Sequence, residues 1–76
     1  MRLYTIYDRL AEEAGPIFES KNDAVALRSI VEVIKNDFDR FQLLYLGYFN
    51  HDPVSLTAEK TPLEVVSPTF AVEDNQ

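Results

Sequence analysis

The side chains best suited to acid–base chemistry in this chain are its single histidine, His51, and several neighbouring carboxylates. One imidazole leaves no second histidine for a proton relay, and residues 50–53, Asn-His-Asp-Pro, are typical of a turn in which an Asn or Asp side chain bonds the local backbone. The carboxylates at residues 12–13 and those of Asp37 and Asp39 lie in polar segments, where such groups are normally solvated rather than divided into an acid and a base. We therefore expect no catalytic residues.

Metal and cofactor sites have no basis in the sequence either. There is no cysteine and only one histidine, so neither a thiolate site nor a paired-imidazole site for zinc is available. The two glycines cannot build a phosphate-cradling loop, and the sequence holds no Walker or dinucleotide-binding motif. We expect a protein without metal or cofactor that is not an enzyme.

The most conspicuous polar cluster is Asn22-Asp23, which follows Ser20 and precedes an alanine-rich segment. The side-chain oxygen of Ser20 or of Asn22 can accept a hydrogen bond from the first turn of a helix, where N–H groups lack backbone partners. Asp23 would place negative charge at the positive end of the helix dipole. These residue types are strongly preferred at helix starts, so a helix cap is favoured over a ligand site.

Aromatic side chains are concentrated in segments with a strand-like pattern, and arginines lie close to them in the sequence. Aromatic platforms combined with positive charge are how many proteins hold single-stranded nucleic acid. The candidate nucleic-acid-binding residues are Arg2, Tyr4, Arg9, Arg40 and Tyr45. The alternative is that most of these rings fill the core or a dimer interface, which we favour because so small a domain has a thin core.

The elements that must position these residues begin with a strand at residues 2–8, where side chains alternate with a period of two. Gly15-Pro16 ends the next segment and a short extended stretch follows. From Ala24 the apolar residues recur at helical spacing and form one wide face, which predicts an amphipathic helix.

The second half of the chain predicts a β-hairpin. Residues 41–49 are rich in leucine and aromatic residues and form the expected central strand, in which Gly47 marks a bulge or a close backbone approach. Alternation resumes after the turn at residues 50–53, so the hairpin covers residues 41–58.

The predicted fold is α+β: a small antiparallel sheet of three to four strands packed on one helix, in the order β-(β)-α-β-β, over residues 1–58. Residues 59–76 are predicted to form an extended arm and an acidic tail. A single core of this size supplies only ~3 to 5 kcal/mol, and association is the supplement that remains without disulfides or metal. We expect a homodimer whose contact includes Leu44, Leu46 and Tyr48 on one face of the central strand, with the helix on the other face.

The charge balance is acidic. Seven Lys and Arg against thirteen Asp and Glu give a formal net charge of −6, opposite to the footprint of a nucleic-acid-binding protein, although a local basic groove stays open. No apolar run approaches the ~20 residues of a membrane helix, and the N-terminal residues show no signal-peptide pattern. We expect a cytoplasmic protein with no membrane partner.

Two stretches resemble a known family. LYTIYDRLAEEAGPIFESKNDAVALR and FDRFQLLYLGYFNHDP are similar to the small nonstructural protein of gokushovirus-type microviruses, which are single-stranded DNA phages. The resemblance covers roughly residues 1–58, and the tail matches more loosely. It implies a non-enzymatic bacteriophage protein of the host cytoplasm that acts in single-stranded genome synthesis or the passage from replication to packaging, and it supplies no functional residues.

Two functions therefore stay open. The first is a small dimeric protein that binds a phage or host replication or packaging protein, because opposite charge would steer an acidic chain toward a basic partner. The alternative is a single-stranded DNA-binding protein that uses the aromatic sheet face flanked by arginines.

Overall fold

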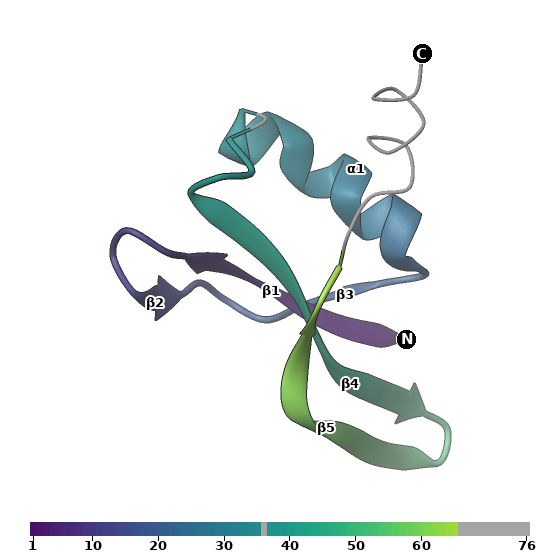
Figure 1. Cartoon of the computed structure of the whole chain (residues 1–76). Coiled ribbons are helices and arrows are strands. Elements are labelled where there is room, and N and C mark those ends of the chain that lie inside the picture. Colours follow the sequence, from purple (N-terminus) through teal and green to yellow (C-terminus); the bar gives the residue numbers. More distant parts are fainter. Residues whose placement is uncertain (36, 66–76) are drawn as a thin grey trace, which may run out of the picture.

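The computed structural model describes residues 1–35 and 37–65 of the chain, and its main feature is an antiparallel β-sheet (Figure 1). The elements in chain order are β1 (Arg2–Asp8), β2 (Glu13–Ala14), β3 (Phe18–Ser20), α1 (Asp23–Ile34), β4 (Phe41–His51) and β5 (Val54–Glu64). The five-stranded sheet has the order β2-β1-β4-β5, and β3 pairs with the same edge of β1 as β2 does. All of these pairings are antiparallel.

The predicted α+β class, with three to four strands packed on one helix, is wrong. The fold is mainly β: five antiparallel strands form a curled half-barrel that carries one short helix. The difference arises in β4 and β5, which are 11 residues each and so about twice the length of an average strand. Their far ends extend beyond the area that α1 covers (Figure 1).

The start and the end of α1 follow from local chemistry. The Asn22 side chain accepts a hydrogen bond from the N–H of Val25 at 2.9 Å, which confirms the predicted cap. Ser20 does not share this role, because its hydroxyl donates to the carbonyl oxygen of Asn22 at 3.4 Å. The helix ends after Ile34, because its C-cap residue Lys35 adopts a left-handed conformation (φ 55°) and donates its N–H to the carbonyl oxygen of Val31.

The core lies between one face of the sheet and one face of α1. Its buried side chains are Tyr4, Ala26, Leu27, Ile30, Ile34 and Leu43. Most of them come from the helix, but Ala24 and Val33 are exposed, so only part of the wide apolar face read from the sequence is used for packing. No helix within the described residues is long and apolar enough to cross a membrane.

β4 is bent by a bulge in its middle. Tyr4 pairs with Tyr45, but Leu3 pairs with Gly47, so Leu46 is the extra residue. Gly47 has φ 156°, and a Cβ at this position would lie 2.3 Å from the carbonyl oxygen of Thr57, so the predicted close backbone approach is confirmed.

The pairing of β5 with β4 is interrupted at the same level. Tyr45 pairs with Leu63 and Gly47 pairs with Ala58, which leaves residues 59–62 without regular partners in β4. β5 continues across the predicted domain boundary at residue 58 to Glu64. Residues 66–76, the rest of the predicted arm and tail, lie outside the described residues.

Candidate interaction surface

Tyr4, a predicted nucleic-acid contact, is a core residue. Its side chain is fully buried, and its hydroxyl donates to Asp23 at 2.6 Å and accepts from Nε of Arg2 at 2.8 Å. Burial, together with the hydrogen bond to Asp23, raises the pKa of Tyr4 to about 12. The ring therefore has no free face on which a base could stack.

Arg2 and Tyr45 lie beside this cluster. Arg2 forms an ion pair with Asp23 at 3.2 Å, and its guanidinium carbon lies 4.0 Å from the centre of the Tyr45 ring. The structure thus brings three of the predicted residues together, Arg2, Tyr4 and Tyr45, but as a packed network that also ties β1 to the start of α1.

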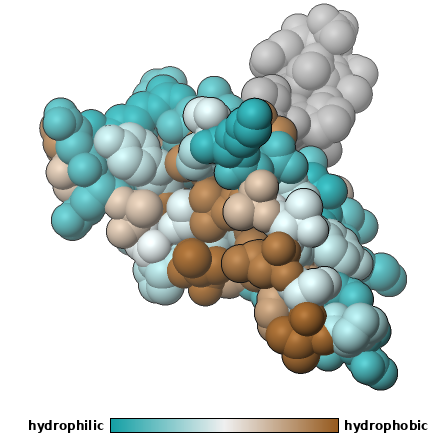
Figure 2. Space-filling view, turned by 90° about the horizontal axis from the view of Figure 1, so that it is seen from below, coloured by the Kyte–Doolittle hydropathy of each residue, from teal (hydrophilic) through white to brown (hydrophobic). Residues whose placement is uncertain are grey.

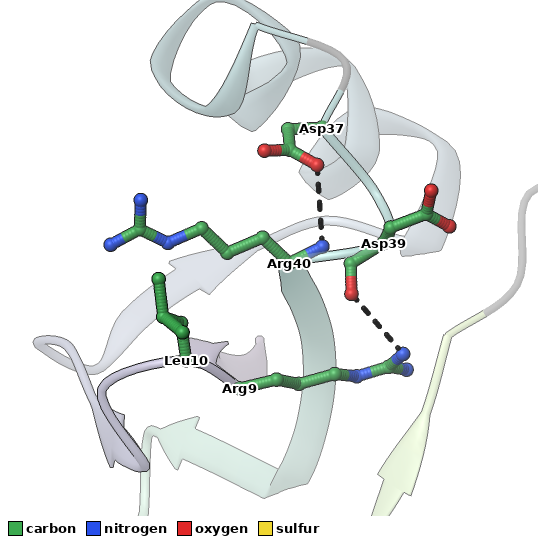
Figure 3. Close-up of a pocket in the computed structure, with 5 residues that line it drawn as sticks. All are labelled: Arg9, Leu10, Asp37, Asp39 and Arg40. Carbon is green, nitrogen blue, oxygen red and sulfur yellow. Dashed lines mark hydrogen bonds between the residues drawn. The ribbon is translucent and has the colours of Figure 1, made fainter.

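Arg9 and Arg40 line a hollow of about 390 Å³ between the turn after β1 and the loop before β4, together with Leu10, Asp37 and Asp39. Arg40 donates to both carboxylate oxygens of Asp8, at 3.1 and 3.0 Å, and this hydrogen bonding lowers the pKa of Asp8. Arg9 forms an ion pair with Glu64 at 3.2 Å and points toward the backbone oxygen of Asp39. Figure 3 shows the two guanidinium groups pointing to opposite sides, so they do not converge on one phosphate.

The three residues of the predicted dimer contact do not share one face of β4. Leu44 pairs with Thr5 and Tyr48 pairs with Arg2, and paired residues lie on the same face of a sheet. Arg2 shares the face of Tyr4, which is covered by α1, whereas Thr5 belongs to the opposite face. In a regular strand Leu44 and Tyr48, four residues apart, would lie on the same face. The extra residue Leu46 reverses the alternation of faces between them, and the spacing of the residues in the sequence could not reveal this.

Apolar side chains are exposed on the face of the sheet that is turned away from α1. Figure 2 shows them as a band that runs toward the end of the β4–β5 hairpin. Val54 and Leu56 are 75% and 62% exposed, and Leu56 pairs with half-buried Phe49. Exposed apolar surface of this kind is typical of protein–protein contacts.

The turn that joins β4 and β5 behaves as the sequence indicated. The Asn50 side chain donates to the carbonyl oxygen of Pro53 at 3.0 Å, which confirms the local backbone bond. His51 contacts Glu19 of β3 at 2.7 Å and packs edge-on against the ring of Phe49. The histidine therefore joins the hairpin to the rest of the sheet.

Sequence reasoning missed two sets of functional candidates. The ion pairs of Asp8 and Asp23 with arginines were not predicted, because the partners are 32 and 21 residues away in the sequence. The exposed start of β5 was assigned to the hairpin but not to a contact, although its alternating pattern of Val, Ser, Leu, Thr and Ala carries no charge. An uncharged segment at the start of a strand, in an otherwise acidic chain, is the signal that could have marked this surface.

Comparison with known proteins gives one match. A family model described as "Phage ORF5 protein" matches residues 1–71. No curated protein and no solved structure matches the chain.

Proposed function

The chain belongs to the phage ORF5 protein family, and we propose that it is a nonstructural, non-enzymatic protein of a gokushovirus-type microvirus. In this proposal it acts in the host cytoplasm during single-stranded genome synthesis or the switch from replication to packaging. It does so by binding a phage or host replication or packaging protein that carries positive charge.

The observation that carries the proposal is the pairing of the arginines. All three arginines of the predicted DNA groove form ion pairs with carboxylates, at 3.2, 3.2 and 3.0 Å. A net charge of −6 then repels a phosphate backbone and attracts a basic protein surface. The exposed apolar band supplies the uncharged contact area that a protein partner needs.

The test is to titrate the chain against each purified replication and packaging protein of the phage and each replication protein of its host, at low and at high salt. We expect one of them to bind, with an association rate that falls as salt rises. Replacing Glu12 and Glu13 with Gln should slow association, whereas the control Lys21→Gln, which removes a positive charge, should not. If none of these proteins binds at low salt, the proposal fails.

Single-stranded DNA binding is the second candidate, and it is supported only by the aromatic content of the sheet. A fluorescent oligonucleotide at low salt separates the two candidates. Tight binding that is lost steeply with salt would favour DNA as the partner, because each phosphate contact releases counterions.

A further inference from the structure

The start of β5, residues 54–58, presents free backbone groups at the open edge of the sheet; we call it the edge segment. Within the described part of the chain, β5 pairs only with β4. The N–H of Phe49 donates to the carbonyl oxygen of Met1 at 2.8 Å, so the backbone groups of Phe49 point toward β1. Along an antiparallel pair of strands, opposite residues alternate between pairs that are hydrogen-bonded to each other and pairs whose backbone groups point away from each other. Leu56 lies opposite Phe49, whose groups point away from β5, so Leu56 turns its own N–H and C=O away from β4. The same alternation applies to Val54 and Ala58.

The edge segment lacks the features that normally protect such an edge. Natural edge strands carry charged residues, prolines or bulges that discourage pairing with another chain. In β5, Lys60 and Pro62 lie in the irregular half, at residues 59–62, and not in the edge segment. An exposed, uncharged and regular strand of this kind is suited to β-augmentation, in which a further strand joins the sheet.

We propose that the strand which joins is the edge segment of a second copy of this chain, paired antiparallel about a two-fold axis at Leu56. Residues paired across such an axis must lie on the same face of the sheet. Because neighbouring residues of a strand lie on opposite faces, the axis has to pass through a residue and not between two residues. With the axis at Leu56, Val54 faces Ala58 of the other copy and Ser55 faces Thr57. Every residue whose backbone groups point outward then gains a bonding partner.

Neighbouring registers are less favourable. An axis at Thr57 would place Glu59 opposite Ser55 and Lys60 opposite Val54. An axis at Ser55 would bring Pro53 into the ladder, where it has no N–H to donate. Only the axis at Leu56 uses all of residues 54–58 without a charge or a proline.

The net charge supports the same location for the contact. Two copies that each carry −6 repel one another, so they associate most easily where the chain has no charge. The pairing would also extend the apolar band, because Leu56 and Val54 of both copies would lie on one face beside Phe49. Five residues per copy make a small contact, well below the ~1,200 Å² of stable complexes, so we expect a weak dimer.

The first experiment measures sedimentation of the full chain over a range of concentrations. We expect a monomer–dimer equilibrium in the parent and loss of the dimer in Leu56→Lys, which sets two charges directly opposite each other. The matched control is Val33→Lys, at a helix position that is 70% exposed, and it should keep the dimer. A parent that stays monomeric at all concentrations, or a Leu56→Lys variant that still dimerises, would overturn the proposal.

The second experiment tests the register and does not depend on the stability of a charged variant. Because the chain has no cysteine, a single introduced cysteine reports one position. Leu56→Cys should oxidise to a covalent dimer, since facing Cα atoms of a hydrogen-bonded pair lie about 5.5 Å apart, within disulfide range. Lys60→Cys should not, because the two copies of residue 60 would be roughly 26 Å apart at ~3.3 Å per residue. Equal cross-linking of both variants would refute this register.

Discussion

At the scale of single residues, the hydroxyl of Tyr4 connects the sheet to the helix. It donates to Asp23 at 2.6 Å, and the pKa of Tyr4 is raised from 10.0 to about 12 because of burial and this bond. A group whose folded pKa is raised stabilises the fold below its unfolded pKa, and this contribution is lost as pH rises through the folded pKa. Stability should therefore fall between pH 10 and pH 12 as Tyr4 ionises.

Tyr4→Phe tests this prediction, because the ring is kept while the hydroxyl is removed. The variant should lose about 1 kcal/mol near neutral pH through the missing hydrogen bond. It should also show a smaller decline than the parent between pH 10 and pH 12, measured by chemical denaturation at each pH. Identical profiles for the variant and the parent would contradict the assigned role of Tyr4.

Arg40 lowers the pKa of Asp8 below its ordinary value of 3.8 by donating hydrogen bonds to the carboxylate. The sign is the reverse of that for Tyr4: the stabilisation is present above pH 3.8 and is lost as pH falls through the lower folded pKa. Arg40→Gln should raise the pKa of Asp8 toward 3.8, as measured by NMR titration of the side-chain carboxyl. Arg28→Gln, on the exposed side of α1, should leave it unchanged.

At the scale of elements, α1 depends on the cap at Asn22. Removing the side-chain oxygen in Asn22→Ala should lower the free energy of unfolding by about 1 kcal/mol, because the N–H of Val25 loses its partner. Lys21→Ala, one residue earlier and exposed, is the control and should have little effect. Equal melting of Asn22→Ala and the parent would show that the cap contributes nothing.

Gly47 is the residue that lets β4 and β5 approach each other. A Cβ there would lie 2.3 Å from the carbonyl oxygen of Thr57 and 2.9 Å from Cα of Ala58, and φ is 156°. Gly47→Ala should cost at least about 1–3 kcal/mol from the unfavourable backbone conformation alone, measured by denaturant unfolding. Gly15→Ala is the matched control, because its Cβ would meet only Ile6 O at 3.6 Å. A Gly47→Ala variant as stable as this control would contradict the close approach.

The parts of the fold that depend on short sequence separations could be predicted. The strand at residues 2–8, the cap at Asn22 and the close approach at Gly47 were all visible, because alternation, capping chemistry and glycine act locally. The sheet curl was not, since it depends on how two 11-residue strands pair around Leu46. The candidate site failed for the same reason: the carboxylates that neutralise Arg2, Arg9 and Arg40 are 21, 55 and 32 residues away.

At the scale of the whole molecule, stability depends on a core with few fully buried side chains. A domain of this size has only ~3 to 5 kcal/mol from its core, whereas truncating one buried Ile to Ala costs about 2–5 kcal/mol. A single core substitution should thus remove most of the stability of the molecule. The sheet and the helix should unfold together, because Tyr4 and Leu43 of the sheet belong to the same buried core cluster as Ile30 of α1.

Ile30→Ala tests this prediction against Val33→Ala on the same helix. Ile30 is 4% exposed and Val33 is 70% exposed, so both variants shorten a side chain in α1 but only the first opens a cavity. At one fixed protein concentration, we expect Ile30→Ala to be largely unfolded and Val33→Ala to melt like the parent. Far-ultraviolet circular dichroism and tyrosine fluorescence should give the same transition, since the tyrosines lie in the sheet and the dichroism also includes the helix. Loss of the helix signal while the tyrosine signal stays native would show that the half-barrel is stable without α1, and that the core shared by the two does not hold the molecule together.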